Sequence, residues 1–180
     1  MYVVQLRPMS ELKAKNRLLR KGYSAIVPME HRFERRQGKW HTKVRILFSS
    51  YLFIDKEELT PKDYHRILEN EYVLRFLGEK GNPTKLSSDE ANFIRFLDAH
   101  PELIKLGNVA KGDTVSIHGV DARIVEIQKR QKRAVFEIDL AGEIHQITLS
   151  CQFEQDDEEG HGLIRPHEEN RRTEYMTTGH

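Results

Sequence analysis

A chain of 180 residues with 38% hydrophobic residues is long enough for one ordinary domain or two small ones with folded cores. No run reaches the roughly 18 apolar residues of a membrane-spanning helix, and the amino terminus lacks the pattern of a signal peptide, so we expect a cytoplasmic protein without membrane contact. The net charge of +1 hides a strong local segregation of 29 basic and 28 acidic residues. Cys151 is the only cysteine, which excludes an internal disulfide and argues against a cysteine-based metal site.

The first hundred residues predict an alternation of strands and helices. Residues 2–6 are apolar and β-branched and precede Pro8, which is typical of a buried strand. Ser10 can cap a helix that ends at Gly22. The predicted apolar stripe of this helix consists of Leu12, Ala14, Leu18 and Leu19. Later elements are expected as strands at 23–28, 45–55 and 72–77, a charged hairpin at 33–40 with its turn at 37–39, a turn at 78–83, and helices starting at Thr60 and Ser88.

This order of elements does not alternate as a doubly wound sheet would. It favours an α+β fold of ferredoxin-like kind, an antiparallel sheet with helices packed on one face. We place this first domain at residues 1–99. Strong periodicity is lost after it, so residues 100–110 are predicted as a linker.

Four short strands are predicted beyond the linker. Turns at Gly119, 129–133 and 141–142 separate them. The strands are expected at residues 114–118, 122–128, 134–140 and 144–149. Such a pattern describes a small SH3-like β-barrel over residues 111–153, with a thin core and marginal stability. Residues 154–180 are acidic and polar and predict a disordered tail.

Several motifs together resemble one family. They are Tyr2-Val3-Val4-Gln5, Val27-Pro28, Phe48 with Tyr51-Leu52-Phe53-Ile54, Phe76-Leu77-Gly78, and Pro83 with Leu86-Ser87. On these motifs residues 1–153 resemble NusG-type transcription elongation factors, with an amino-terminal (NGN) domain followed by a KOW barrel. The resemblance implies that the first domain binds the clamp helices of the largest subunit of RNA polymerase, keeps the clamp closed and suppresses pausing.

The chain departs from the pattern of the family at four places. Ser49-Ser50 stands where Pro-Gly is usual, and Asn70-Glu71-Tyr72 stands where Thr-Pro-Gly is usual. Met1 replaces a tryptophan, and Ala122 replaces a glycine of the KOW segment. Such departures resemble a specialised antitermination paralog of the RfaH or LoaP kind rather than the general factor.

The candidate polymerase-binding residues centre on the strand after Phe48. Because side chains in a strand alternate between its faces, Tyr51 and Phe53 share one face while Leu52 and Ile54 share the other. Aromatic residues are favoured anchors of protein interfaces. The alternative is that these aromatics only fill the core. The predicted set is Gln5, Phe48, Tyr51, Phe53, Tyr72 and Phe76.

The candidate nucleic-acid-binding residues lie in two basic segments. Arg35 and Arg36 lie in the hairpin beside the aromatics Phe33 and Trp40, and basic groups interleaved with rings suit phosphate and stacked bases. A turn of the barrel carries Lys129, Arg130, Lys132 and Arg133, which are placed to meet phosphate. The resemblance adds Arg7 as a DNA contact. The alternative for both segments is a solvated loop.

No enzyme motif is present. The sequence has no phosphate-binding Gly-rich loop, no nucleophile elbow and no metal-ligand spacing of histidines or cysteines, so we expect no catalysis, no metal and no cofactor. The expected function is transcription antitermination by a monomer that binds RNA polymerase. The barrel is expected to bind DNA or RNA, a ribosomal protein or a termination factor. The alternatives are an RNA-binding module in ribosome assembly and the general NusG factor acting in termination.

Overall fold

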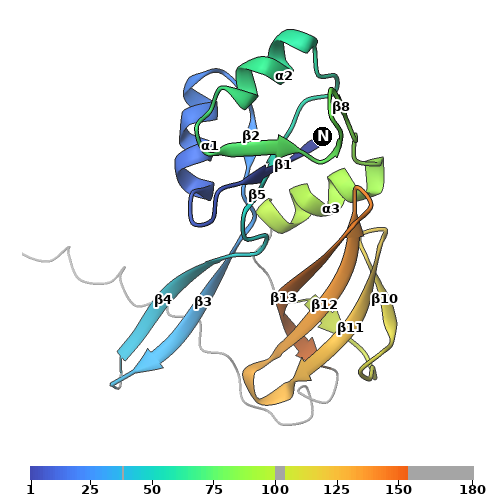
Figure 1. Ribbon diagram of the computed structural model, residues 1–180. Coiled ribbons are helices and arrows are strands. Elements are labelled where there is room, and N and C mark those ends of the chain that lie inside the picture. Colours follow the sequence, from blue (N-terminus) through green and yellow to red (C-terminus); the bar gives the residue numbers. More distant parts are fainter. Residues whose placement is uncertain (38, 100–103, 154–180) are drawn as a thin grey trace, which may run out of the picture.

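The computed structural model describes residues 1–37, 39–99 and 104–153, which form a four-stranded sheet with three helices and a five-stranded barrel beside it (Figure 1). The side chains of residues 31–36 and 39–42 are not described. The predicted tail at 154–180 and residues 100–103 of the predicted linker lie outside the described residues. The α+β class, with an antiparallel sheet followed by a small barrel, is confirmed.

The first sheet has a simple register. Its strands follow the order β2 (Ala25–Ile26), β5 (Tyr51–Ile54), β1 (Tyr2–Leu6) and β6 (Val73–Phe76). Val3 of β1 stands opposite Phe53 of β5, and Val4 stands opposite Leu52. Since side chains alternate along a strand, the sheet has a Val3 face and a Val4 face.

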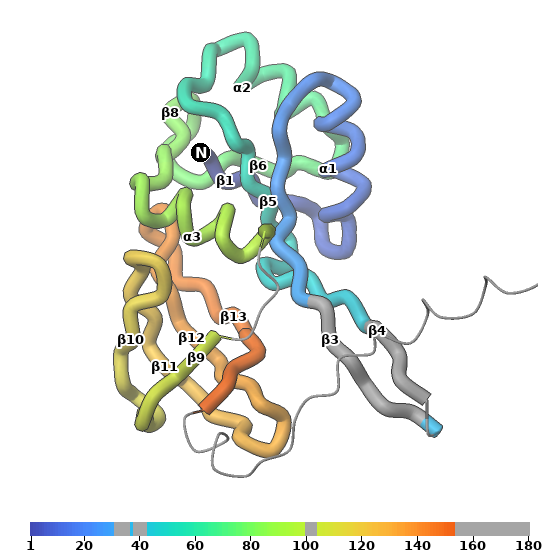
Figure 2. Tube along the Cα trace, turned by 180° about the vertical axis from the view of Figure 1, so that it is seen from behind, coloured from blue at the N-terminus to red at the C-terminus, as the bar shows by residue number. Residues whose placement is uncertain are grey.

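The helices divide between the two faces of this sheet (Figures 1 and 2). α1 (Glu11–Arg20) and α2 (Pro61–Leu68) pack on the Val4 face. α3 (Ser88–Ala99) packs on the Val3 face through Phe93 and Ile94, so the expectation that all helices share one face is wrong. The third helix leaves part of the Val3 face for another element to cover.

The apolar stripe of α1 differs from the prediction. Glu11, Ala14 and Leu18 face the sheet, whereas Leu12 and Leu19 are 46% and 47% exposed. Glu11 takes a buried position because its carboxylate accepts a hydrogen bond from the Ser50 backbone N–H at 2.7 Å. Two predicted stripe residues, Ala14 and Leu18, are therefore buried, and Glu11 takes the place expected for Leu12 and Leu19.

The strand predicted at residues 45–55 is interrupted. Two strands form, β4 (Lys39–Ile46) and β5, and the chain turns between them. Ser50 has φ of 66°, a left-handed conformation that glycine adopts most easily, and the hydrogen bond from its N–H to Glu11 holds it there. A residue on α1 thus supports the left-handed turn at Ser50, one of the departures named above.

Two hairpins complete the first half of the chain. β3 (Met29–Arg36) and β4 pair along their whole length, so the predicted charged hairpin forms, with longer arms than expected. The turn predicted at 78–83 contains a short hairpin of β7 (Gly78–Glu79) and β8 (Asn82–Pro83). Gly78 has φ of 98°, and a Cβ there would lie 2.5 Å from the Thr84 backbone nitrogen, so only glycine fits.

The barrel contains one strand that the sequence did not reveal. Its order is β10 (Thr114–Ile117), β11 (Val120–Gln128), β12 (Arg133–Leu140), β13 (Glu143–Phe153) and β9 (Ile104–Leu106). A 3-10 turn, η1 (Lys129–Gln131), joins β11 to β12. β9 lies within the predicted linker and pairs in parallel with β13. Three residues are too short for an alternating pattern to be read, and their partners lie 47 positions away.

The hydrophobic core has two parts. One lies between the Val4 face and the helices α1 and α2. The other begins at Val3 and Phe53, continues through α3 and ends inside the barrel at Phe136 and Ile138. The barrel therefore does not depend on a thin core of its own, because its apolar residues are continuous with those of the first sheet.

Candidate functional site

The aromatic residues of β5 lie as their spacing predicts. Tyr51 and Phe53 point to the Val3 side of the sheet, and Leu52 and Ile54 point to the other side. Phe48, from the turn before β5, meets Phe53 edge to face with ring centroids 5.1 Å apart. Gln5 of β1 stands opposite Tyr51. We call the surface made by these four predicted residues the aromatic face: Gln5, Phe48, Tyr51 and Phe53.

The barrel covers the aromatic face. The ring of His145, on β13, lies edge to face with Tyr51 at 4.7 Å and with Phe48 at 6.0 Å between centroids. Phe48 and Phe53 are buried and Tyr51 is half-buried. The sequence predicted these residues as a surface for a partner, and the structure places a second part of the same chain on them.

Polar groups line the edge of this contact. Glu143 of β13 accepts hydrogen bonds from the Tyr51 hydroxyl at 3.3 Å and from the Arg75 guanidinium at 3.0 Å. Arg75, on β6, also donates to the Gln5 side-chain oxygen at 2.8 Å. Burial and the nearby Glu143 charge raise the pKa of Tyr51, so its hydroxyl stays protonated and remains a donor.

Two more carboxylates bind the barrel at points away from this edge. Glu90 of α3 accepts a hydrogen bond from the Ala141 backbone N–H at 2.9 Å. Burial alone would raise the pKa of Glu90, but hydrogen bonds from Ala141 and Ser87 outweigh it and hold the pKa below its ordinary value. Glu30, at the base of the β3–β4 hairpin, accepts from both the backbone N–H and the hydroxyl of Ser150 on β13.

Two predicted polymerase-binding residues do not join the aromatic face. Phe76 lies on the opposite face of the sheet, where it stacks on Tyr64 of α2 with centroids 5.1 Å apart. Tyr72 packs against the same helix-side cluster. Phe76 pairs with Val4 of β1 and therefore lies on the Val4 face. This register cannot be read from the local sequence, so the sequence alone could not separate Phe76 and Tyr72 from Tyr51 and Phe53.

The predicted basic residues lie at separate places. Arg7 is exposed directly after β1. Arg35 and Arg36 lie near the end of β3, and their side chains lie outside the described residues. The other four occupy the turn between β11 and β12, in which Lys129 and Arg130 are exposed and Lys132 and Arg133 are half-buried. In Figure 1 the β3–β4 hairpin and this turn both extend away from α2.

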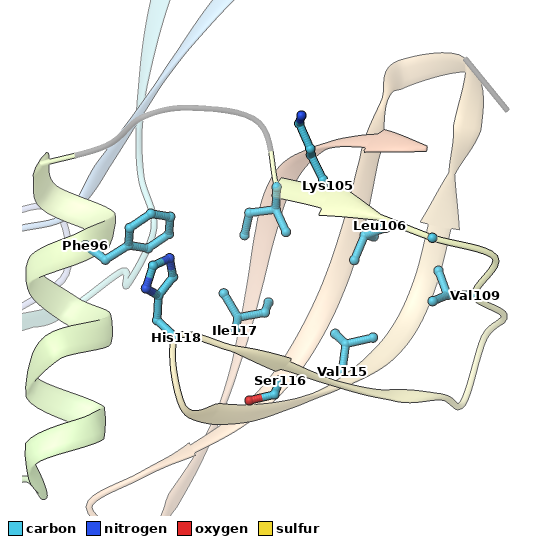
Figure 3. A pocket seen from close by; sticks show the side chains of 10 residues that line it. Phe96, Lys105, Leu106, Val109, Val115, Ser116, Ile117 and His118 are labelled. Atoms are coloured by element: carbon cyan, nitrogen blue, oxygen red, sulfur yellow. The ribbon is translucent and has the colours of Figure 1, made fainter. Parts of the chain in front are cut away.

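A cleft of about 560 Å³ opens between the barrel edges β9 and β10 (Figure 3). Its walls are mainly apolar, with Leu106, Val109 and Val115 along it. At one end His118 stacks on Phe96 of α3, with centroids 3.6 Å apart. This cleft separates the two strand edges of the barrel and lies apart from the aromatic face.

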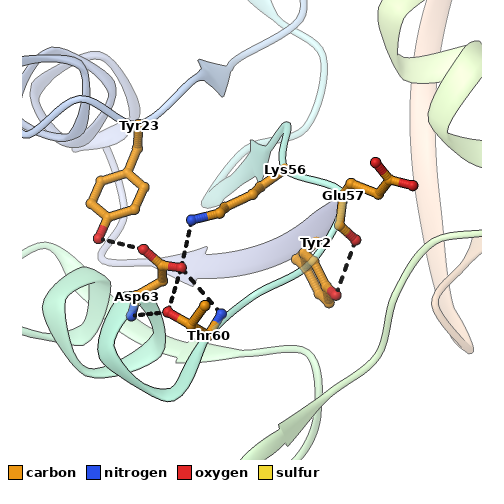
Figure 4. A network of polar contacts seen from close by, with 6 residues as sticks. All are labelled: Tyr2, Tyr23, Lys56, Glu57, Thr60 and Asp63. Atoms are coloured by element: carbon orange, nitrogen blue, oxygen red, sulfur yellow. Dashed lines mark hydrogen bonds and ion pairs between the residues drawn. The ribbon is translucent and has the colours of Figure 1, made fainter.

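A polar network fixes α2 on the other side of the sheet (Figure 4). Asp63 accepts hydrogen bonds from Lys56, the Thr60 hydroxyl and the Tyr23 hydroxyl, and Thr60 accepts from the Asp63 backbone N–H. The bond from Lys56, followed by those from Thr60, holds the pKa of Asp63 far below its usual range. The network is a helix cap joined to the end of β5, and it is remote from the aromatic face.

Comparisons with known proteins found one matching family model and a solved structure of similar fold. A family model described as "Transcription termination factor nusG" matches residues 1–95, more than half of the 180 residues. A solved structure described as "Domain interaction in Thermotoga maritima NusG" is 18% identical, with 82% of this chain and 91% of that chain covered and a TM-score of 0.56. At that identity the likeness is one of fold.

Two further structures, conformations A and B of the MjSpt4:Spt5 complex, are 16% and 15% identical to the chain. The first match covers 83% of this chain and 91% of the other chain, and the second covers 82% and 90%. Their TM-scores of 0.29 are too low to carry an argument. No curated protein matches the chain.

Proposed function

The chain belongs to the NusG family of transcription factors, and we propose that it is an elongation factor that binds RNA polymerase and promotes processive antitermination. The aromatic face is the observation that carries this proposal, because it joins apolar anchors at its centre to polar groups at its edge. The mechanism is binding alone, without catalysis, cofactor or metal. A factor that prefers the closed clamp by about 1.4 kcal/mol shifts a pausing equilibrium about tenfold.

The proposed docking residues are Phe48, Tyr51 and Phe53, with Gln5 at the rim, and the proposed partner is the pair of clamp helices of the largest polymerase subunit. The proposal leaves out Phe76 and Tyr72, which pack under α2. Since the barrel residue His145 covers Phe48 and Tyr51, polymerase binding on this surface requires the barrel to move away first.

The barrel can leave the first sheet only if the two are separate domains joined by a connecting segment. We propose residues 1–99 as the polymerase-binding domain, 100–110 as the connection, 111–153 as the KOW-like domain and 154–180 as a tail. β9 lies within the connection by sequence, but its pairing with β13 means that it would move with the barrel.

Nucleic acid is a second proposed partner. The exposed Lys129 and Arg130 support contact of the barrel with phosphate, and the backbone of β3 places Arg35 and Arg36 near the end of a long hairpin. Arg7 is proposed as a further DNA contact. A ribosomal protein or a termination factor is the other proposed partner of the barrel. The site of action is the transcription machinery of the cytoplasm, where the factor would act as a monomer.

Two roles within the family remain to be separated by experiment. The departures at Ser49-Ser50 and Met1 favour a specialised paralog of the RfaH or LoaP kind, and the Ser50 turn has its own support in Glu11. The description of the matching family model favours the general factor, which acts in termination.

The test is single-round transcription by the host polymerase across an intrinsic terminator, together with co-elution of the factor and the polymerase. Tyr51→Ala removes a half-buried ring of the aromatic face, and Tyr64→Ala removes a comparable ring from the α2 side as a matched control. We expect wild-type protein and Tyr64→Ala to increase read-through and Tyr51→Ala to lose polymerase binding. Increased termination would support the general factor, and RNA binding without polymerase co-elution would support a ribosome-assembly module.

A further inference from the structure

His145 occupies the centre of the contact between the barrel and the aromatic face. Its side chain is only 8% exposed, and its ring meets Tyr51 and Phe48 at interplanar angles of 85° and 73°. Among the buried side-chain nitrogen and oxygen atoms of the described residues, the His145 Nε2 atom alone has no hydrogen-bond partner. A buried imidazole nitrogen without a hydrogen-bond partner is an unfavourable place for a positive charge.

The charged and titratable groups around this ring are largely committed to other partners. Glu143, on the same strand, accepts from Tyr51 of β5 and Arg75 of β6. Asp139 of β12 accepts from the Gly142 backbone N–H. From α3, Glu90 reaches only the backbone of Ala141 in this part of the barrel. Burial lowers the pKa of His145, and the charges of Glu143 and Asp139 with hydrogen bonding to the Leu140 backbone only partly oppose it.

We propose that His145 is a protonation-sensitive latch: the neutral ring holds the barrel on the aromatic face, and the protonated ring releases it. The consequence of release for polymerase binding rests on the function proposed above, whereas the release itself does not.

The direction of the pH effect follows from which state binds the proton more tightly. In the closed state burial holds the pKa of His145 below 6.5, and a released, solvated ring regains its ordinary value of about 6.5. Protons therefore bind preferentially to the released state, so closure is fully favoured above about pH 6.5. As the pH falls below this value, each pH unit raises the ratio of released to closed molecules by up to about tenfold, until the closed-state pKa is reached.

The first measurement is the radius of gyration of the full chain by small-angle scattering between pH 8 and about pH 5.5, a range in which ordinary carboxylates stay ionised. We expect a constant radius above about pH 6.5 and an increase below it. His145→Phe keeps an aromatic ring but cannot be protonated, so this variant should stay closed throughout. A constant radius in the wild type, or an unchanged increase in His145→Phe, would overturn the latch.

His118 provides the matched control. Among the histidines whose side chains the structure describes, its ring also lies between the barrel and the first domain, against Phe96, and it is exposed. His118→Phe should retain the pH response of the wild type. Loss of the response in His118→Phe together with its retention in His145→Phe would transfer the role to His118 and overturn the proposal.

Direct titration of the His145 ring by NMR in the wild-type chain needs no variant and covers the case in which His145→Phe fails to fold. A closed-state pKa at or above the ordinary histidine value would overturn the proposal. Polymerase co-elution over the same pH range then separates the two proposals. Release of the barrel without polymerase binding would contradict the proposed function and leave the latch intact. Polymerase binding that is independent of pH, with a constant radius, would support the function and contradict the latch.

Discussion

The two faces of the four-stranded sheet are both buried, but in different ways. The Val4 face is covered by α1 and α2, which connect directly to its strands, and its centre is aliphatic, with Leu52 and Ile54. The Val3 face is covered partly by the barrel, and the edge of that contact consists of Tyr51, Arg75 and Glu143. Polar groups at an edge can exchange their partners for water at small cost, as in transient interfaces. We therefore propose that the Val4 face is permanently buried and that the part of the Val3 face under the barrel is buried reversibly.

The largest expected effect is on the Val4 face. Leu52 is 0% exposed, so Leu52→Ala should lower the free energy of unfolding by about 2–5 kcal/mol through lost burial and the cavity left behind. Denaturant unfolding of the full chain measures this loss in the free energy of unfolding. Leu74→Ala, at a leucine that is 52% exposed on β6 of the same sheet, serves as the control and should change stability by less than about 0.5 kcal/mol. Equal losses in the two variants would contradict the picture of a permanently buried face.

Reversal of the charge at Arg75 should release the barrel from the Val3 face without unfolding the sheet. Arg75→Glu places two carboxylates together at the edge of the barrel contact, and we expect the ratio of released to closed molecules to rise about tenfold. Small-angle scattering at pH 8 measures the release. The double variant Arg75→Glu, Glu143→Arg restores opposite charges and should recover most of the closure. Failure of this rescue would mean that the ion pair does not hold the barrel.

A smaller loss of stability is expected from the cap of α2, which packs on the Val4 face. Thr60 and Asp63 form a capping box, with hydrogen bonds in both directions between side chain and backbone. Thr60→Ala should lower the free energy of unfolding by about 1 kcal/mol, measured by thermal or denaturant unfolding. The radius of gyration should not change, because α2 does not touch the barrel contact. A larger radius in this variant would show that the two faces are coupled through the sheet.

The smallest expected effect tests whether the barrel stays folded when it leaves the sheet. Burial raises the pKa of the Cys151 thiol to about 12, so alkylation of the native chain at pH 8 should be slow. Arg75→Glu should leave this rate unchanged, because Cys151 lies inside the barrel and not on its outer surface. Mass spectrometry of the alkylated chain measures the rate. Fast labelling of Arg75→Glu would mean that the barrel unfolds on release.

The local pattern of the chain was sufficient for most elements. Alternation along residues 51–54 predicted which side chains share a face, the Thr60-Pro61 pair predicted the start of α2, and the turns of the barrel predicted four of its strands. Each of these signals depends on neighbours within a few positions. The same local reasoning placed Leu12 and Leu19 in the core, where the structure has Glu11 instead, because the partner of Glu11 is the distant Ser50.

The amino-acid sequence was enough to predict the antiparallel α+β domain, the small barrel and the shared face of Tyr51 and Phe53, since hydrophobic period and turn residues act locally. Three contacts became visible only in the folded chain: β9 pairs with β13, Phe76 faces α2, and His145 covers Tyr51 and Phe48. His145 lies more than ninety positions from Tyr51 along the chain. Contacts across such separations leave no periodic trace in either segment, because each segment forms the same strand whether or not the other packs against it.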